Sequence, residues 1–334
     1  MEKFDNQEKI IELIEQGLEF RRQGTYDEAI LCFDNIIKLD PTYVDAYHNK
    51  ALVLSDQNLF EESNYCYDQI IQIEPTHKKA WSNKGEALSS LQNLPESMAC
   101  YDEAIKINDK FTIVLFLKSN LLYELGEYEE SIQFCDKVIC IEPKDAYAWL
   151  IKGMSLLHLG KNEESIVCFN EVIGFEDVDH YSICGAWNEK GLACAHLGKY
   201  EESIRCFDEV IRIDPNYENA WSNKGNSLLE IEKYEESVLS CDEAIKLNSE
   251  FAEAWSNKGV SLYSLKKYEE AILCYNEVIR IDPNFENIWY NKGWALNSLN
   301  RKEESQLCFD KVNQLNNKKM LNFVGSITGI KSNN

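Results

Sequence analysis

A tryptophan that recurs every 34 residues constrains the fold of this chain more than any other feature. Trp221, Trp255 and Trp289 mark this Trp position, and the small position follows four residues later. The small position is filled nine times, by Gly17, Ala51, Gly85, Ser119, Gly153, Gly191, Gly225, Gly259 and Gly293. The step from Gly153 to Gly191 is 38 residues instead of 34. A period of this length predicts a stack of similar units, each burying its apolar face on its neighbours.

Each copy contains two runs of apolar residues with helical spacing. In copy eight the first run carries Gly259 and Leu262, and the second carries Tyr275 and Val278. A short turn, often with Gly or Asn, separates the runs, and an acidic pair opens the second run, where it suits the helix dipole. Proline closes five copies because it cannot continue a helix, at Pro41, Pro75, Pro143, Pro215 and Pro283.

These patterns predict how the chain is organised. We expect an N-terminal extension at residues 1–9 and nine helix–turn–helix units at residues 10–319. A tail at 320–334 follows, with the apolar sequence MLNFVGSITGI, which folds back over Trp294 or reaches a partner. Four additional residues near 178–183 lengthen either a loop or the following helix. Loops tolerate insertions of this size at small cost.

The order of Trp, Gly, small residue, aromatic residue and Pro resembles the tetratricopeptide repeat (TPR) family, through nine copies and nearly the whole chain. Copy four departs from it, with Leu115 and Ser119 in place of Trp and Gly. The resemblance implies an all-α fold, a right-handed superhelical α-solenoid whose first helices line a concave groove. It also implies a non-catalytic interaction scaffold or adaptor that binds an extended peptide or a partner helix there. A regulatory subunit of an enzyme and a self-assembling structural solenoid are the alternatives.

One position of the first helices carries asparagine in five copies, at Asn49, Asn83, Asn223, Asn257 and Asn291. An asparagine amide both donates and accepts hydrogen bonds, so a ladder of them can hold the main chain of an extended peptide. The alternative is that these amides bond neighbouring helices to each other. Between the two blocks of asparagines, Leu117, Ile151 and Glu189 occupy the same position.

Apolar residues are expected to complete the groove. A central patch is predicted from Phe116, Tyr123, Leu150, Met154 and Leu157, and a C-terminal group from Tyr263, Tyr290 and Trp294. Aromatic residues and methionine are typical of binding surfaces. The alternative is that these side chains are buried inside the solenoid or under the tail.

The charge of the chain limits its partners. Asp and Glu number 57 against 34 Lys and Arg, which gives a formal net charge of −23. Such a chain repels phosphate backbones and anionic membranes, so we expect no nucleic acid and no membrane insertion. Because acidic residues also dominate the groove positions, we expect a protein or peptide partner that is neutral to basic and partly apolar. A ladder of lysines just before the small position is expected to pair with aspartates of the second helices.

The sequence offers no site for catalysis or for a cofactor. Seven of the twelve cysteines share one position of the second helix, which is typical of small apolar residues in a packed seam. His158 and His196 recur near the ends of first helices, too sparsely to predict a metal site. We find no phosphate loop and no nucleophile motif. The sequence therefore predicts no enzyme activity, no cofactor and no metal. Because no stretch has the length of a membrane-spanning helix and Met1 to Lys9 is too charged for a secretory signal, we expect a cytoplasmic protein.

Overall fold

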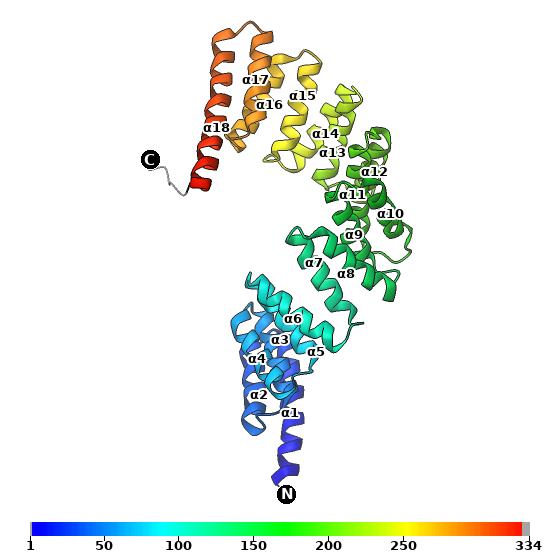
Figure 1. Ribbon diagram of the computed structural model, residues 1–334, viewed down its shortest axis with the longest axis vertical. Helices are drawn as coiled ribbons and strands as arrows, with labels where there is room; N and C mark the ends of the chain where they lie inside the picture. Colours follow the sequence, from blue (N-terminus) through cyan, green and yellow to red (C-terminus); the bar gives the residue numbers. More distant parts are fainter. Residues whose placement is uncertain (1, 329–334) are drawn as a thin grey trace. The chain divides into compact units, whose positions relative to one another are not determined.

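The computed structural model describes residues 2–328, and side chains at 6–316. This part of the chain forms eighteen α-helices and no strand, so the predicted all-α solenoid of tandem helix pairs is confirmed (Figure 1). Contacts divide the chain into two compact units, residues 1–159 and 160–334, and the boundary in the sequence falls between the two helices of copy five.

The first unit contains α1 (Glu2–Gln23), α2 (Tyr26–Leu39), α3 (Val44–Asp56), α4 (Phe60–Ile73), α5 (Lys78–Ser90), α6 (Leu94–Ile107), α7 (Thr112–Glu124), α8 (Tyr128–Ile141) and α9 (Ala146–His158). The second contains α10 (Asn162–Gly174), α11 (His180–His196), α12 (Tyr200–Ile213), α13 (Glu218–Glu230), α14 (Tyr234–Leu247), α15 (Ala252–Ser264), α16 (Tyr268–Ile281), α17 (Glu286–Ser298) and α18 (Lys302–Thr328). Within each unit, helices that follow one another in the sequence pack together.

The ends of the chain extend the outermost helices. Helix α1 begins at Glu2, so the backbone of the expected N-terminal extension is part of the first helix. Helix α18 is 27 residues long and continues through Thr328, so much of the expected tail is helical. Residues 329–334 of that tail lie outside the described residues. The four additional residues lengthen a helix: α11 has 17 residues, and its N-cap Asp179 accepts a hydrogen bond from the amide of Ser182.

The turn between the two helices of a copy needs a residue in the left-handed region. Gly126 adopts φ 81° there, as Gly24, Gly160 and Gly198 do with similar angles. The other five copies place a residue with a side chain at φ near 60°: Asn58, Gln92, Glu232, Lys266 and Asn300. Three of these are neither Gly nor Asn, although the left-handed region costs such residues about 1–2 kcal/mol.

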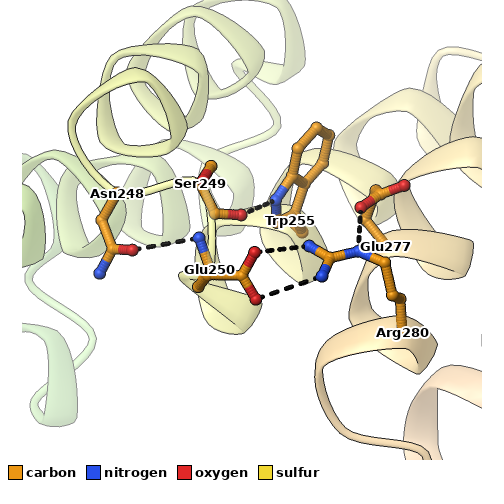
Figure 2. Close-up of polar contacts among 6 residues, drawn as sticks. All are labelled: Asn248, Ser249, Glu250, Trp255, Glu277 and Arg280. Atoms are coloured by element: carbon orange, nitrogen blue, oxygen red, sulfur yellow. Dashed lines mark hydrogen bonds and ion pairs between the residues drawn. The ribbon is translucent and has the colours of Figure 1, made fainter.

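The recurring tryptophan joins the first helix to the loop before it. In Figure 2, the indole Nε1 of Trp255 donates a hydrogen bond of 2.9 Å to the carbonyl oxygen of Ser249. The same bond, to the carbonyl of the closing proline, is made by Trp81, Trp149, Trp221 and Trp289. Arg280, on the second helix of that copy, bonds Glu250 beside this loop (Figure 2). In these five copies the Trp side chain therefore fastens the start of the first helix to the loop before it.

In five copies the glycine at the small position lies against an aromatic side chain of the second helix, whereas Gly225 lies against Cys241. A Cβ atom added to Gly259 would lie 2.5 Å from the ring of Tyr275, and one added to Gly191 would lie 2.6 Å from Phe207. Helices separated by a Cα hydrogen alone can approach closely, and the ring fills the space between copies. We call this ring site the aromatic position, and its residues are Phe33, Tyr67, Tyr101, Cys135, Phe169, Phe207, Cys241, Tyr275 and Phe309.

The expected lysine–aspartate pairs are present between the second helix of one copy and the first helix of the next. Lys224 lies 2.6 Å from Asp208, and the same pair joins Lys50–Asp34, Lys84–Asp68, Lys118–Asp102, Lys152–Asp136 and Lys258–Asp242. In all six copies with Trp at the Trp position the lysine also lies over the indole, at 4.9–6.0 Å from the ring centroid. The lysine ladder is therefore part of the packing between copies.

Candidate functional site

The second unit contains a pocket on the first helices of its last two copies. It measures about 270 Å³ and is lined by Val260 and Tyr263 of α15, Asn291 and Trp294 of α17, and Tyr275 of α16. Tyr263, Asn291 and Trp294 are residues that the sequence assigned to the groove. The structure thus brings an amide and two aromatic rings from two separate copies to one site, which we call the α15–α17 pocket.

The rings of this pocket are held by neighbouring aromatic side chains. Tyr263 meets Tyr268 edge to face at a centroid distance of 5.3 Å. Trp294 is packed in the same way against Tyr290 and Phe309, at 6.0 and 5.8 Å, yet 43% of its surface is exposed. A ring that is held on one face and open on the other is suited to covering an apolar ligand group.

Some asparagines of the ladder form hydrogen bonds within the protein, and one lines the pocket. The Nδ2 of Asn49 donates to the carbonyl of Asp45 in its own helix, and that of Asn223 donates to Oδ1 of Asn188 in the preceding copy. Asn83 and Asn257 are half-buried, and Asn83 forms a hydrogen bond with Tyr67. Asn223 therefore bonds one first helix to its neighbour, which is the alternative to ligand binding, whereas Asn291 lines the α15–α17 pocket.

The central apolar patch is partly used for packing in the first unit. Phe116 meets Tyr147 of the next first helix edge to face, at 6.2 Å between centroids. The hydroxyl of Tyr123 lies 3.1 Å from Nε2 of His158. Leu150 is only 8% exposed, so it leaves little surface for a ligand, while Met154 and Leu157 are half-buried.

A second, polar pocket of about 210 Å³ lies between α5 and α7 in the first unit. Glu86 and Glu124 line it together with Tyr101, Leu117 and Asn120. Asn120 donates a hydrogen bond of 2.9 Å to Glu124. Two carboxylates beside an apolar floor can receive a basic side chain whose aliphatic part packs below them.

Glu189 of α11 is a carboxyl group with restricted access to water. Burial raises its pKa, and a hydrogen bond from Asn188 and the nearby His196 offset part of this effect. The amide of Asn188 lies 3.0 Å from the carboxylate, and Asn188 itself is bonded to Asn223. The sequence placed Glu189 in the groove but gave no signal of this burial.

The raised pKa of Glu189 predicts a pH-dependent stability. A carboxyl whose pKa is higher in the folded state binds protons more tightly when folded. The free energy of unfolding therefore falls as the pH rises from the ordinary pKa of a glutamate to the raised pKa of Glu189. Glu189→Gln is therefore expected to stabilise the chain at pH 7 by up to about 1 kcal/mol. The gain should vanish below about pH 4, where the carboxyl is protonated in both states. Urea unfolding at pH 7 and below about pH 4 measures the gain in stability, with the exposed Glu230→Gln as control. An equal gain at the two pH values would contradict the prediction.

The cysteines have the environment of packing residues. Eleven of the twelve are buried and Cys140 is exposed. Burial raises the pKa of Cys135 to about 11 and that of Cys241 to about 12, which suppresses the reactive thiolate. Within the described residues no group of side chains could hold a metal ion, and no helix there is long and apolar enough to cross a membrane.

Models of one repeat family match most of the chain. Models described as "Tetratricopeptide repeat" match residues 78–111, 113–145, 146–177, 185–217, 218–251, 252–285 and 274–306, and one described as "TPR repeat" matches 17–58. A search of curated proteins found no match.

Several solved structures are similar in fold. A tetratricopeptide repeat protein from Parabacteroides merdae ATCC 43184 is 16% identical, with a TM-score of 0.52 over 86% of this chain and 99% of that one. In the APC/C hetero-tetramer Cut9–Hcn1, one chain is 14% identical, with a TM-score of 0.56 over 85% of this chain and 55% of that one. MamA from Desulfovibrio magneticus RS-1 is 22% identical, with a TM-score of 0.47 over 52% of this chain and 96% of that one.

Proposed function

Because the chain belongs to the tetratricopeptide repeat family, we propose that it is a non-catalytic scaffold that binds an extended peptide segment of a partner protein along its first helices. The observation that carries the proposal is the α15–α17 pocket, in which Tyr263, Asn291 and Trp294 from two copies meet. The proposal also places the protein in the cytoplasm, where its cysteines stay reduced.

The chemistry of the pocket defines the peptide. A volume of about 270 Å³ between two aromatic rings accommodates one apolar side chain of the ligand. The amide of Asn291 supplies a donor and an acceptor at the rim, which can pair with one peptide unit of an extended main chain. We infer that the pocket takes a leucine-sized or aromatic residue and that Asn291 fixes the direction of the chain beside it.

Acidic groups favour a basic peptide. Glu189 carries a carboxylate that burial disfavours, and a lysine or arginine of the ligand would stabilise its charged form. Glu86 and Glu124 offer the same attraction in the first unit. With a net charge of −23, the chain also attracts basic segments from a distance. The proposed ligand therefore combines an apolar residue with Lys or Arg.

A phage-displayed library of twelve-residue peptides tests the proposal. We expect the full chain to enrich peptides with an apolar residue flanked by Lys or Arg. A selected peptide should bind Tyr263→Ala and Asn291→Ala at least about tenfold more weakly than the wild type, since central contacts carry most of the binding energy. Fluorescence anisotropy of the labelled peptide measures both constants.

The matched control is Leu273→Ala, which shortens an apolar side chain of α16 that is 65% exposed and outside the pocket. This variant should bind the peptide as the wild type does. If no motif is enriched, or if the pocket variants and the control bind equally well, the α15–α17 pocket is not the peptide site.

A further inference from the structure

The last copy leaves open a surface that every earlier copy buries. Phe207 at the aromatic position and Val210 three residues later are both 0% exposed, and the same two positions are at most 2% exposed in all copies from one to eight. In copy nine these positions are Phe309 and Val312, and both are only half-buried. Tyr290 and Trp294 beside them are 49% and 43% exposed.

The earlier copies show what kind of segment covers this surface. Phe207 and Val210 pack against Ala220 of the next first helix, and Lys224 of that helix pairs with Asp208 at 2.6 Å. Ser227, seven residues after Ala220, is also buried. The covering helix thus presents an apolar residue, a lysine four residues later and a small or apolar residue three after that.

This pattern is repeated by each first helix after α1. The triplets are Ala46–Lys50–Val53, Ala80–Lys84–Ala87, Val114–Lys118–Leu121, Ala148–Lys152–Ser155, Ala186–Lys190–Ala193, Ala254–Lys258–Ser261 and Ile288–Lys292–Ala295. Residues spaced by four and seven positions lie on one face of a helix. Copy nine keeps the receiving groups, since Asp310 follows Phe309 as Asp208 follows Phe207.

The end of the chain does not supply the covering helix within the described residues. In earlier copies the second helix is short: α12 and α16 each end after 14 residues, and the chain then turns back into the next first helix. Helix α18 continues for 27 residues up to Thr328 without such a turn. The carboxylate of Asp310 accepts a hydrogen bond of 2.9 Å from Gln306, one turn earlier in α18.

A second copy of this chain is a poor occupant. Its own first helix, α1, carries Glu12, Gln16 and Glu19 at the three positions of the pattern. The two glutamates are exposed and would place two carboxylates against Phe309, Val312 and Asp310. Buried unpaired charges beside an aspartate oppose stacking of this kind.

We propose that the C-terminal end surface, formed by Tyr290, Phe309, Asp310 and Val312, binds an α-helix of a partner protein. That helix carries a small apolar residue, a lysine four residues later and a small residue seven residues later. Its apolar residues cover Phe309 and Val312, and its lysine pairs with Asp310. The site adjoins the α15–α17 pocket, because Trp294 of the pocket lies against Tyr290 and Phe309, but it takes a helix, whereas the pocket takes an extended peptide.

A helix-stabilised, fluorescein-labelled peptide with the sequence of α15, Ala252–Ser264, is the probe. A covalent brace is needed because helices of this length are marginal in isolation. We expect it to bind the full chain in an anisotropy titration. A second peptide with the α1 residues, Ala254→Glu, Lys258→Gln and Ser261→Glu, should bind at least about tenfold more weakly. Equal binding of both peptides, or no binding of either, would overturn the proposal.

Variants of the chain locate the contact. Val312→Glu should weaken binding of the α15 peptide by about tenfold or more. Asp310→Lys should weaken it about threefold. An α15 peptide with Lys258→Glu should bind the Asp310→Lys chain as tightly as the unchanged peptide binds the wild type. Leu307→Glu, on a side chain of α18 that is 68% exposed, is the matched control and should leave binding unchanged.

Two further outcomes separate the alternatives. Tyr263→Ala, on the side of the pocket formed by α15, should leave the α15 peptide bound, because the ring contact of Tyr263 is with Tyr268 and not with the end surface. Sedimentation of the free chain should show a monomer. A dimer that is lost in Val312→Glu would assign the surface to a second copy and overturn the partner helix.

Discussion

Phe207→Ala is expected to lower the free energy of unfolding of the second unit by about 3–5 kcal/mol. Phe207 is fully buried, packs with Val210 and Ala220, and lies against Gly191, whose lack of a side chain gives the ring its place. Removing the ring leaves a cavity between two helices and the next copy, which the close packing of rigid helices fills only in part. Urea unfolding followed by circular dichroism measures the change.

Phe309→Ala is the matched comparison at the last aromatic position. Because Phe309 is only half-buried, its truncation should cost about 1–2 kcal/mol. Repeat proteins can unfold from their ends, so hydrogen exchange should be recorded for each helix along with the urea curve. We expect Phe309→Ala to increase exchange in α17 and α18 alone, and Phe207→Ala in α11 to α13. Equal costs for the two variants would show that the C-terminal end surface is covered in the free protein.

The repeat could be predicted from the sequence because each structural role is tied to one offset. Helix pairs follow from the 34-residue period, and the lysine–aspartate pairs follow from two offsets that meet between neighbouring copies, as for Lys224 and Asp208. Such contacts depend on the register of the repeat alone. They survive in copy four, where Lys118 pairs with Asp102 although Trp and Gly are missing.

Other contacts depend on which residues happen to be neighbours, and the offsets do not reveal them. Asn223 is bonded to Asn188 because copy six places an asparagine one residue before the ladder position. Leu150 is buried although its equivalent Tyr290 is 49% exposed. The Trp indole bond to the preceding loop was also missed, since spacing shows that a large residue is needed but not where its N–H points. The site could therefore be predicted as a surface, and its individual residues only in part.

The second large effect is expected at the contact between Gly259 and Tyr275. Gly259→Ser should destabilise the second unit by about 1–3 kcal/mol, because its Cβ would lie 2.5 Å from the tyrosine ring. Tyr275→Cys should cost about 3–5 kcal/mol, because the ring is 1% exposed and its removal leaves a large cavity. Both values are measured by urea unfolding, as for Phe207→Ala.

Copy four indicates how the two changes should combine. There Ser119 stands at the small position and Cys135 at the aromatic position, and both are fully buried. The larger side chain on the first helix occupies part of the space that the smaller one on the second helix leaves. The loss in the free energy of unfolding of the double variant Gly259→Ser, Tyr275→Cys should therefore be about 1–2 kcal/mol smaller than the sum of the two single losses.

A pair in one copy that does not touch the other provides the control for this coupling. Gly259→Ser combined with Phe207→Ala joins changes in copies eight and six, and their costs should add within about 0.5 kcal/mol. If both double variants are additive, the ring and the glycine do not determine each other's size, and the close approach of the two helices has another cause. If only the Gly259 and Tyr275 pair is coupled, the summed size of these two residues sets the spacing between α15 and α16. Copy four then keeps its place in the stack by exchanging a glycine and a ring for two side chains of intermediate size.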